Sequence, residues 1–273
     1  MVRKAYLSVF FLCLFICTGC PENYLEEKAL KIHESVLTVD THVDTPLMIH
    51  YSDLDLGEYH DPYEEYSKVD FPRMEEGGLD AIFFAFFVAQ GPRTPEGNEE
   101  ARQLFLTLYS STDEQLQQYT DRAEIALSPG DAYSLEVEGT RAIFFGMENG
   151  YPIGTDLSLV NTYYDLGIRY ITLCHTSNND ICDSSTDSGD PEHNGLSDFG
   201  MQVVQEMNRL GMMVDVSHIS DEAFYDVLEI TTAPVIASHS NARSVYNHPR
   251  NMSDGMLNAL AENGGVIQVP LLY

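Results

Sequence analysis

Residues 212–240 read MMVDVSHISDEAFYDVLEITTAPVIASHS. This stretch contains two short apolar runs, 212–216 and 234–237, and a histidine follows each run by two residues, at His218 and His239. Between the runs, apolar residues recur at three- and four-residue spacing after an acidic residue: Ala223, Val227 and Ile230 follow Asp221. That spacing is typical of an amphipathic helix. A strand, a helix and a second strand in this order predict two parallel strands joined by a crossover helix.

Similar apolar runs of strand length occur on both sides of this stretch. Five such runs are 36–39, 81–88, 142–145, 170–173 and 266–269. Together with 212–216 and 234–237 they predict seven strands. A second helical pattern follows the cap-like Ser197: Phe199, Val203, Met207 and Leu210. Strands that alternate with helices form a parallel sheet, and 273 residues are enough for one barrel-sized domain. We therefore expect an α/β fold, a (β/α)8 TIM-type barrel of the amidohydrolase-like kind with its eighth strand missing.

Histidines and carboxylates stand at the ends of five of these runs: His42, Asp44, Glu148, His175, His218 and His239. His42 and Asp44 are two residues apart, so the period-two geometry of a strand points both side chains to one face. In parallel α/β folds, functional side chains gather at the carboxyl ends of the strands. Any one of these residues alone is explained as the polar end of a strand at the surface. Imidazoles and carboxylates that converge on one mouth are what zinc requires, so the set predicts a metal site.

The number of carboxylates favours two metal ions. Two dications a few ångströms apart repel each other, so they need a shared anionic ligand, and a glutamate can place one oxygen on each ion. Glu148 is the natural bridge. Related amidohydrolase barrels commonly use a carboxylated lysine instead, but here every lysine precedes the second strand: Lys4, Lys28, Lys31 and Lys68.

Taken in order, these motifs resemble those of the membrane (renal) dipeptidase family of zinc metallopeptidases. The resemblance extends from residue 37 to residue 269 and is most specific in DTHVD (40–44), GMENG (146–150), LCHTSN (173–178), VDVSH (214–218) and PVIASHS (234–240). It implies that His42 and Asp44 bind one zinc ion and that His218 and His239 bind the other. The resemblance also implies that Glu148 bridges the two ions.

The resemblance also implies an activity, which is hydrolysis of the peptide bond of small dipeptides by a hydroxide that bridges the two zinc ions. His175 and Glu148 are the implied catalytic residues, and His175 orients the substrate and steadies the oxyanion. Arg250, in Pro249-Arg250-Asn251, is expected to pair with the free carboxylate of the dipeptide. The planar fork of a guanidinium suits that bidentate task.

The family pattern continues into an eighth strand that ends in Gly-x-Asp-Phe-Asp-Gly, whose first aspartate handles the proton of the leaving amine. This chain ends at Tyr273, so we expect that strand and that aspartate to be missing. Two alternatives to an active dipeptidase follow. One is a truncated, weakly active or inactive relative that binds metal or peptide. The other is a different hydrolase of the amidohydrolase-like barrels.

The N-terminus resembles a bacterial lipoprotein signal. Arg3 and Lys4 precede an apolar run at residues 6–16, which is shorter than the roughly 20 residues that a spanning helix needs. The sequence Thr18-Gly19-Cys20 follows as in a lipobox, although Cys17 stands where an aliphatic residue is usual. A plain secretory signal is the alternative. We expect lipidation at Cys20.

This interpretation divides the chain into a signal peptide (1–19), a tether (20–31) and a metallopeptidase barrel domain (32–273). It places the protein in the bacterial cell envelope, lipid-anchored and extracytoplasmic. Two cysteines then remain as thiols, Cys174 and Cys182. They either form a disulfide, as an oxidising compartment permits, or stay as small buried thiols.

The charge of the chain limits its partners. With 14 basic and 43 acidic residues, the net charge is −29, which repels phosphate backbones and excludes nucleic acid as a partner. The expected partners are a dipeptide substrate and, through the lipid anchor, a membrane. The oligomeric state is left open, with a homodimer as one alternative.

Overall fold

The structure is a computed structural model, and it describes residues 22–63 and 67–271. The chain divides into two units, Met1–Val36 and Leu37–Tyr273. The described part of the first unit contains the helix α1 (Glu22–His33), which covers most of the segment expected to be a tether. Within the described residues, no helix is both long and apolar enough to cross a membrane. The expected signal peptide and Cys20 lie outside the described residues.

The second unit is built around a sheet of eight strands in which every paired neighbour runs parallel. Seven strands follow the order β1-β2-β4-β5-β6-β7-β8, and β3 pairs with β4 off this path. Their bounds are β1 (Val39–Val43), β2 (Ala81–Phe87), β3 (Ala123–Ile125), β4 (Arg141–Glu148), β5 (Ile168–Thr172), β6 (Met213–Asp215), β7 (Ile236–Ala237) and β8 (Val266–Ile267). The predicted parallel α/β architecture is confirmed, while the three-residue β3 is an addition to the seven predicted strands.

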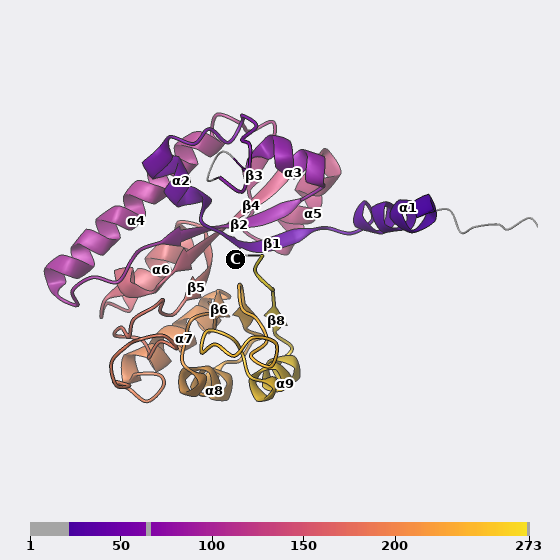
Figure 1. The fold of residues 1–273 in the computed structure, drawn as a ribbon. Coiled ribbons are helices and arrows are strands. Elements are labelled where there is room, and N and C mark those ends of the chain that lie inside the picture. Colours follow the sequence, from indigo (N-terminus) through magenta and orange to yellow (C-terminus); the bar gives the residue numbers. More distant parts are fainter. Residues whose placement is uncertain (1–21, 64–66, 272–273) are drawn as a thin grey trace, which may run out of the picture. The chain divides into compact units, whose positions relative to one another are not determined.

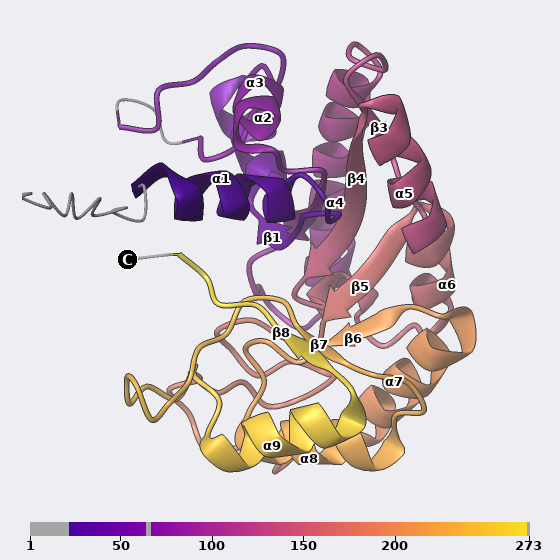
Figure 2. The same cartoon turned by 90° about the vertical axis from the view of Figure 1, so that its right-hand side faces the viewer.

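Helices alternate with the strands along the chain (Figure 1). They are α2 (Thr45–Ser52), α3 (Phe71–Gly77), α4 (Pro95–Leu116), α5 (Pro129–Glu138), the 3-10 turn η1 (Tyr151–Ile153), α6 (Ser158–Asp165), α7 (Asp198–Leu210), α8 (Asp221–Ile230) and α9 (Asp254–Asn263). Figure 2 shows α7, α8 and α9 side by side next to β6, β7 and β8. Two helices predicted from periodicity are confirmed: Ser197 caps α7 and Ser220 caps α8, each hydroxyl accepting a backbone N–H of the first turn.

The central strands are buried on both faces, which explains their continuous apolar sequences. On one face, Phe83 of β2 stacks on Phe144 of β4 at 4.7 Å between ring centroids and lies 5.4 Å from Tyr170 of β5. On the other face, Phe86 of β2 packs against Phe105 of α4 at 5.4 Å. The layer that contains Tyr170 borders the carboxyl end of β1, because the hydroxyl of Tyr170 lies 3.0 Å from Nδ1 of His42.

The path of strands ends at β1 on one side and at β8 on the other. Across this seam the hydroxyl of Thr41 lies 2.8 Å from the carbonyl oxygen of Ser238, and the side chain of Gln268, which follows β8, makes further contacts with β1. Its Oε1 accepts the backbone N–H of Thr41 at 2.9 Å and lies 2.7 Å from the Thr41 hydroxyl, while its Nε2 donates to the carbonyl of Val39 at 3.3 Å. A side-chain amide thus joins the two terminal strands of the path.

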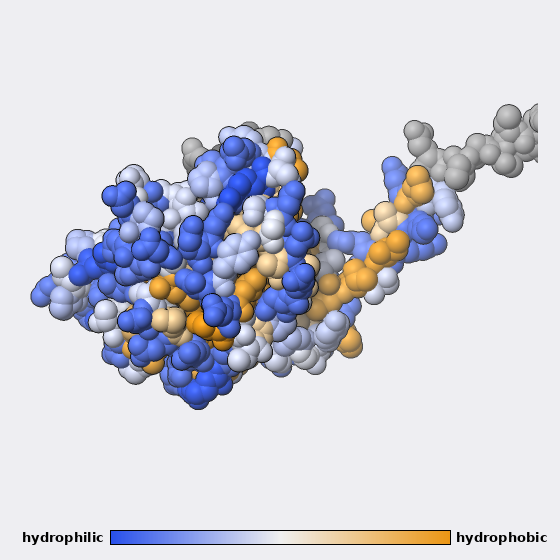
Figure 3. All heavy atoms as spheres, turned by 90° about the horizontal axis from the view of Figure 1, so that it is seen from below, coloured by the Kyte–Doolittle hydropathy of each residue, from blue (hydrophilic) through white to orange (hydrophobic). Residues whose placement is uncertain are grey.

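Hydrophilic side chains predominate on the face of the molecule drawn in Figure 3. This agrees with the surplus of acidic residues, 43 against 14 basic ones. The two cysteines of the second unit are both free and buried, so the alternative of buried thiols is the one that the structure contains.

Candidate metal centre

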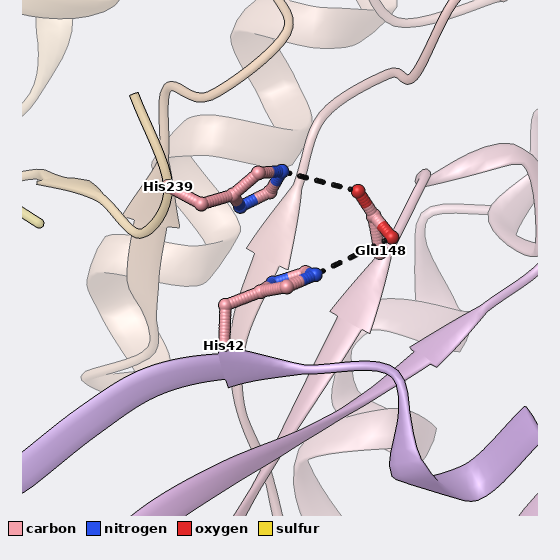
Figure 4. A group of neighbouring side chains, drawn as sticks. All are labelled: His42, Glu148 and His239. Carbon is pink, nitrogen blue, oxygen red and sulfur yellow. Dashed lines mark ion pairs between the residues drawn. The ribbon is translucent and has the colours of Figure 1, made fainter. Parts of the chain in front are cut away.

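Glu148, the last residue of β4, lies at the centre of the predicted site. Its side chain is only 5% exposed. Its Oε1 lies 3.1 Å from Nε2 of His218 and 3.3 Å from Nε2 of His239, whereas its Oε2 lies 3.6 Å from Nε2 of His42. Figure 4 shows His239 and His42 reaching Glu148 from two separate segments of the chain. The two oxygens of one carboxylate therefore face two different sets of imidazoles.

Potential ligand atoms form two overlapping groups around this carboxylate. One contains His42, Glu148 and His239, and the other contains Glu148, His175 and His218, with the ligand atoms of each group within 4.8 Å of one another. The Nε2 atoms of His218 and His239 are 2.9 Å apart. The structure thus brings together all four histidines predicted from the strand ends.

Asp44 occupies a different position from the one predicted. The sequence places it on the first strand, but β1 ends at Val43 and Asp44 precedes the first turn of α2. Its side chain is 58% exposed, and its Oδ1 still lies 3.6 Å from Nε2 of His42. The helix turn, and not strand alternation, brings this carboxylate to the histidine. The first strand itself begins and ends later than the predicted run 36–39.

The donor set fits zinc. Burial opposes a charge on His42, but Asp44 and Glu148 outweigh it and raise its pKa to about 10. Burial disfavours the charged form of His218 and His239. It lowers the pKa of His218 to about 3 and the pKa of His239 below its ordinary value. Although burial opposes its ionisation, Glu148 has a pKa well below the usual range because His218, His239 and His42 surround it. Zinc binds neutral imidazoles and ionised carboxylates, so His218, His239 and Glu148 already have the binding form, whereas His42 has to release its proton when zinc binds.

The backbone is strained where it carries this site. His218 has φ of 72° and Asn149, next to Glu148, has φ of 76°, a left-handed region that residues other than glycine rarely adopt. Both positions are held by hydrogen bonds. The carbonyl of His218 accepts from the backbone N–H of Ser185 at 2.8 Å, and the amide of Asn149 donates to the carbonyl of Val88 at 2.9 Å. Such strain is concentrated at functional sites, where the surrounding structure enforces it.

His175 and Arg250, the predicted substrate-binding residues, lie at the edge of the same site. The ring of His175 is 4.1 Å from that of His218 and 4.5 Å from that of Phe87. Arg250 comes from the loop between β7 and α9, and its guanidinium donates to the hydroxyl of Ser240 at 2.9 Å and to the carbonyl of His239 at 2.8 Å. The guanidinium is therefore fixed directly beside a candidate ligand.

Three residues behind the histidines are not predicted by the motifs. The hydroxyl of Tyr170 lies 3.0 Å from Nδ1 of His42, and the hydroxyl of Ser238 lies 2.8 Å from Nδ1 of His239. Ser238 also bonds to Asp215, which is fully buried. The sequence does carry one signal, because Asp215 is a charged residue inside an otherwise apolar strand, and such a residue needs buried partners.

A parallel α/β sheet with histidines and a carboxylate at the carboxyl ends of its strands is the arrangement on which metal-dependent hydrolases of the TIM-barrel type build their sites. The sequence model of the membrane dipeptidase family, peptidase family M19, matches residues 26–273. The chain belongs to this family of dipeptidase-type enzymes.

Individual relatives agree with this membership. The chain is 34% identical over 257 residues to "Dipeptidase verJ" of Clonostachys rogersoniana, covering 90% of this chain and 65% of that protein. It is 31% identical to "Dipeptidase 3" of Mus musculus, covering 90% of this chain and 49% of that protein. Among solved structures, the probable dipeptidase PvdM from Pseudomonas aeruginosa superposes with a TM-score of 0.82 at 31% identity, over 91% of this chain and 63% of that one. The chain thus spans about half to two thirds of the length of these relatives.

Proposed function

We propose that the protein is a zinc-dependent dipeptidase that holds two zinc ions per chain. The observation that carries the proposal is the orientation of Glu148, whose Oε2 faces His42 while its Oε1 faces His218 and His239. His42 and Asp44 would hold one ion, His218 and His239 the other, and Glu148 would bridge them. A shared carboxylate offsets the repulsion between two neighbouring dications.

When bound, the zinc ions supply a water of lowered pKa and polarise the carbonyl of the peptide bond. The residues of the chain would bind and orient the substrate around them. His175, 3.6 Å from Oε1 of Glu148 through its Nε2, lies where it can donate a hydrogen bond to the oxygen of that carbonyl. Burial lowers the pKa of His175, so near neutral pH it would act as a neutral donor.

The proposed substrate class is a dipeptide with a free carboxylate. Arg250 is held beside His239 by two hydrogen bonds, which leaves further guanidinium donors for the carboxylate of a substrate. Pairing with this fixed cation would set the length of the substrate between the reacting carbonyl and the C-terminus. The dipeptidase names of the relatives agree with that length.

The first test compares two substrates that differ in one group. With zinc present we expect the protein to release free amino acid from Gly-Leu and to cleave the amide Gly-Leu-NH2 much more slowly, because the amide lacks the carboxylate that pairs with Arg250. Stripping the metal with a chelator should abolish both reactions, and returning zinc should restore them. Equal cleavage of the two substrates would overturn the proposed role of Arg250, and metal-independent cleavage would overturn the zinc mechanism.

A further inference from the structure

Asp215 is the last residue of β6 and is completely buried behind the candidate ligands. Its Oδ1 accepts the backbone N–H groups of Ser217 and Ser238, both at 3.0 Å. Its Oδ2 accepts the hydroxyls of Thr172 at 2.5 Å and Ser238 at 2.6 Å. Four donors on two oxygens leave no room for a proton on the carboxyl group, so Asp215 is a carboxylate that only accepts.

This arrangement determines where the proton of His239 lies. The Ser238 hydroxyl has a single hydrogen, and Asp215 accepts it. The contact of 2.8 Å between the same hydroxyl oxygen and Nδ1 of His239 can therefore be a hydrogen bond only if Nδ1 carries the proton. Nε2 of His239 is then left with a free lone pair, and it is the atom that faces Glu148.

His218 provides a contrast within the same site. Its Nδ1 is buried and has no hydrogen-bond partner among the described residues. Its Nε2 lies 2.9 Å from Nε2 of His239 and 3.1 Å from Oε1 of Glu148. Because Nε2 of His239 accepts, Nε2 of His218 must be the donor in that contact. The two neighbouring histidines thus have opposite tautomers in the metal-free protein.

We infer that Asp215, acting through Ser238, is a positioning residue that fixes His239 in the Nδ1-protonated tautomer and so presents its Nε2 as a ready metal ligand. The consequence for metal binding rests on the proposed zinc site, but the tautomer itself does not. Outer partners of this kind orient a ligating histidine, and losing one typically weakens metal binding by about 10- to 100-fold.

The chain offers a matched control for testing this inference. Thr172 and Ser238 each donate one hydroxyl to the same oxygen of Asp215, but only Ser238 also contacts His239. Ser238→Ala and Thr172→Val therefore remove equivalent bonds from the carboxylate and differ in their link to the histidine. Ser238→Thr keeps the hydroxyl and should rescue the function.

The readout is the long-range ¹H–¹⁵N spectrum of histidine-labelled, chelator-treated protein, followed by a zinc titration against a competing chelator. We expect an Nδ1–H signal for His239 and an Nε2–H signal for His218 in wild type, Thr172→Val and Ser238→Thr. In Ser238→Ala, His239 should become a tautomer mixture, and the affinity for one zinc ion should fall about 10- to 100-fold. An Nε2–H signal for His239 in wild type, or equal losses of zinc affinity in Ser238→Ala and Thr172→Val, would overturn the inference. If wild type bound no zinc, the proposed function would fail, while the spectrum would still decide the tautomer.

Discussion

Glu148 gains its role from its surroundings more than from its own chemistry. A buried carboxyl group ordinarily resists ionisation. Here His218 and His42 face different oxygens of the carboxylate and help keep its pKa well below the usual range despite the burial. The site therefore holds a permanent negative charge between imidazoles, which is an attractive place for a dication.

Arg250 is the residue proposed to pair with the carboxylate of the substrate. Arg250→Ala should raise KM for Gly-Leu by about 10- to 100-fold, since hydrogen bonds to a charged group contribute about 1.5 to 3 kcal/mol. The turnover number should change less, because the peptide bond is cleaved away from this contact. Steady-state kinetics would check it, with Arg209→Ala as the control, since Arg209 is exposed on α7 and pairs with Glu206. An unchanged KM in Arg250→Ala would assign the substrate carboxylate to another group.

At the scale of the elements, the strands that carry the ligands could be predicted from the sequence. Continuous apolar runs flanked by helical periodicity identify buried parallel strands, and Glu148 and His239 follow such runs as predicted. The three-residue β3 cannot be predicted from the sequence, because so short a segment has no detectable period of apolar residues. The sequence predicts Asp44 on a strand because a spacing of two residues does not show whether the strand continues or a helix begins.

The residues behind the ligands could not be predicted for a different reason. Ser238 reaches Asp215 because β6 and β7 pair with Asp215 opposite Ile236. Such a register across strands is set by packing and is not encoded in any local pattern. The same holds for Tyr170, whose contact with His42 joins residues that are 128 positions apart in the chain.

Gly146 of β4 lies directly against the ring of Tyr170 in β5. A Cβ added to Gly146 would come within 2.2 Å of the buried ring of Tyr170, the residue that holds Nδ1 of His42. Gly146→Ala should therefore lower the free energy of unfolding by about 1 to 3 kcal/mol, as overpacking of a core does. It should also weaken zinc binding, because Tyr170 must move. Thermal unfolding and zinc titration measure the two effects.

Gly77→Ala is the matched control for Gly146→Ala. A Cβ at this position in α3 meets no atom within 4 Å. Its stability and zinc affinity should stay close to those of wild type. If Gly146→Ala were as stable as this control, β4 and β5 would be less tightly packed than the structure indicates.

The whole molecule combines a strongly acidic chain with a site built for cations. The net charge of −29 attracts dications at long range and repels the carboxylate of a substrate. Arg250 counters that repulsion locally. Raising the ionic strength reduces both long-range effects, while the buried contacts of the site persist.

We propose that the protein is anchored to the membrane of the bacterial cell envelope through a lipid on Cys20, on its extracytoplasmic side. The motif Thr18-Gly19-Cys20 after a short apolar run motivates this proposal. Wild-type protein expressed in a bacterial host should partition into the detergent phase, and Cys20→Ala should lose both the lipid and the processed N-terminus. Cys17→Ala should behave as wild type. Equal partitioning of Cys20→Ala and wild type would show that another feature holds the protein at the membrane.

The most direct test of the two-metal account is the number of zinc ions bound per folded chain. Elemental analysis after dialysis should give a value close to two for wild type. Glu148→Gln, which removes the charge while keeping the shape of the side chain, should give one or fewer, because the bridge between His42 on one side and His218 and His239 on the other is lost. A folded wild type that binds one ion or none, or a Glu148→Gln variant that still holds two ions tightly, would contradict the account.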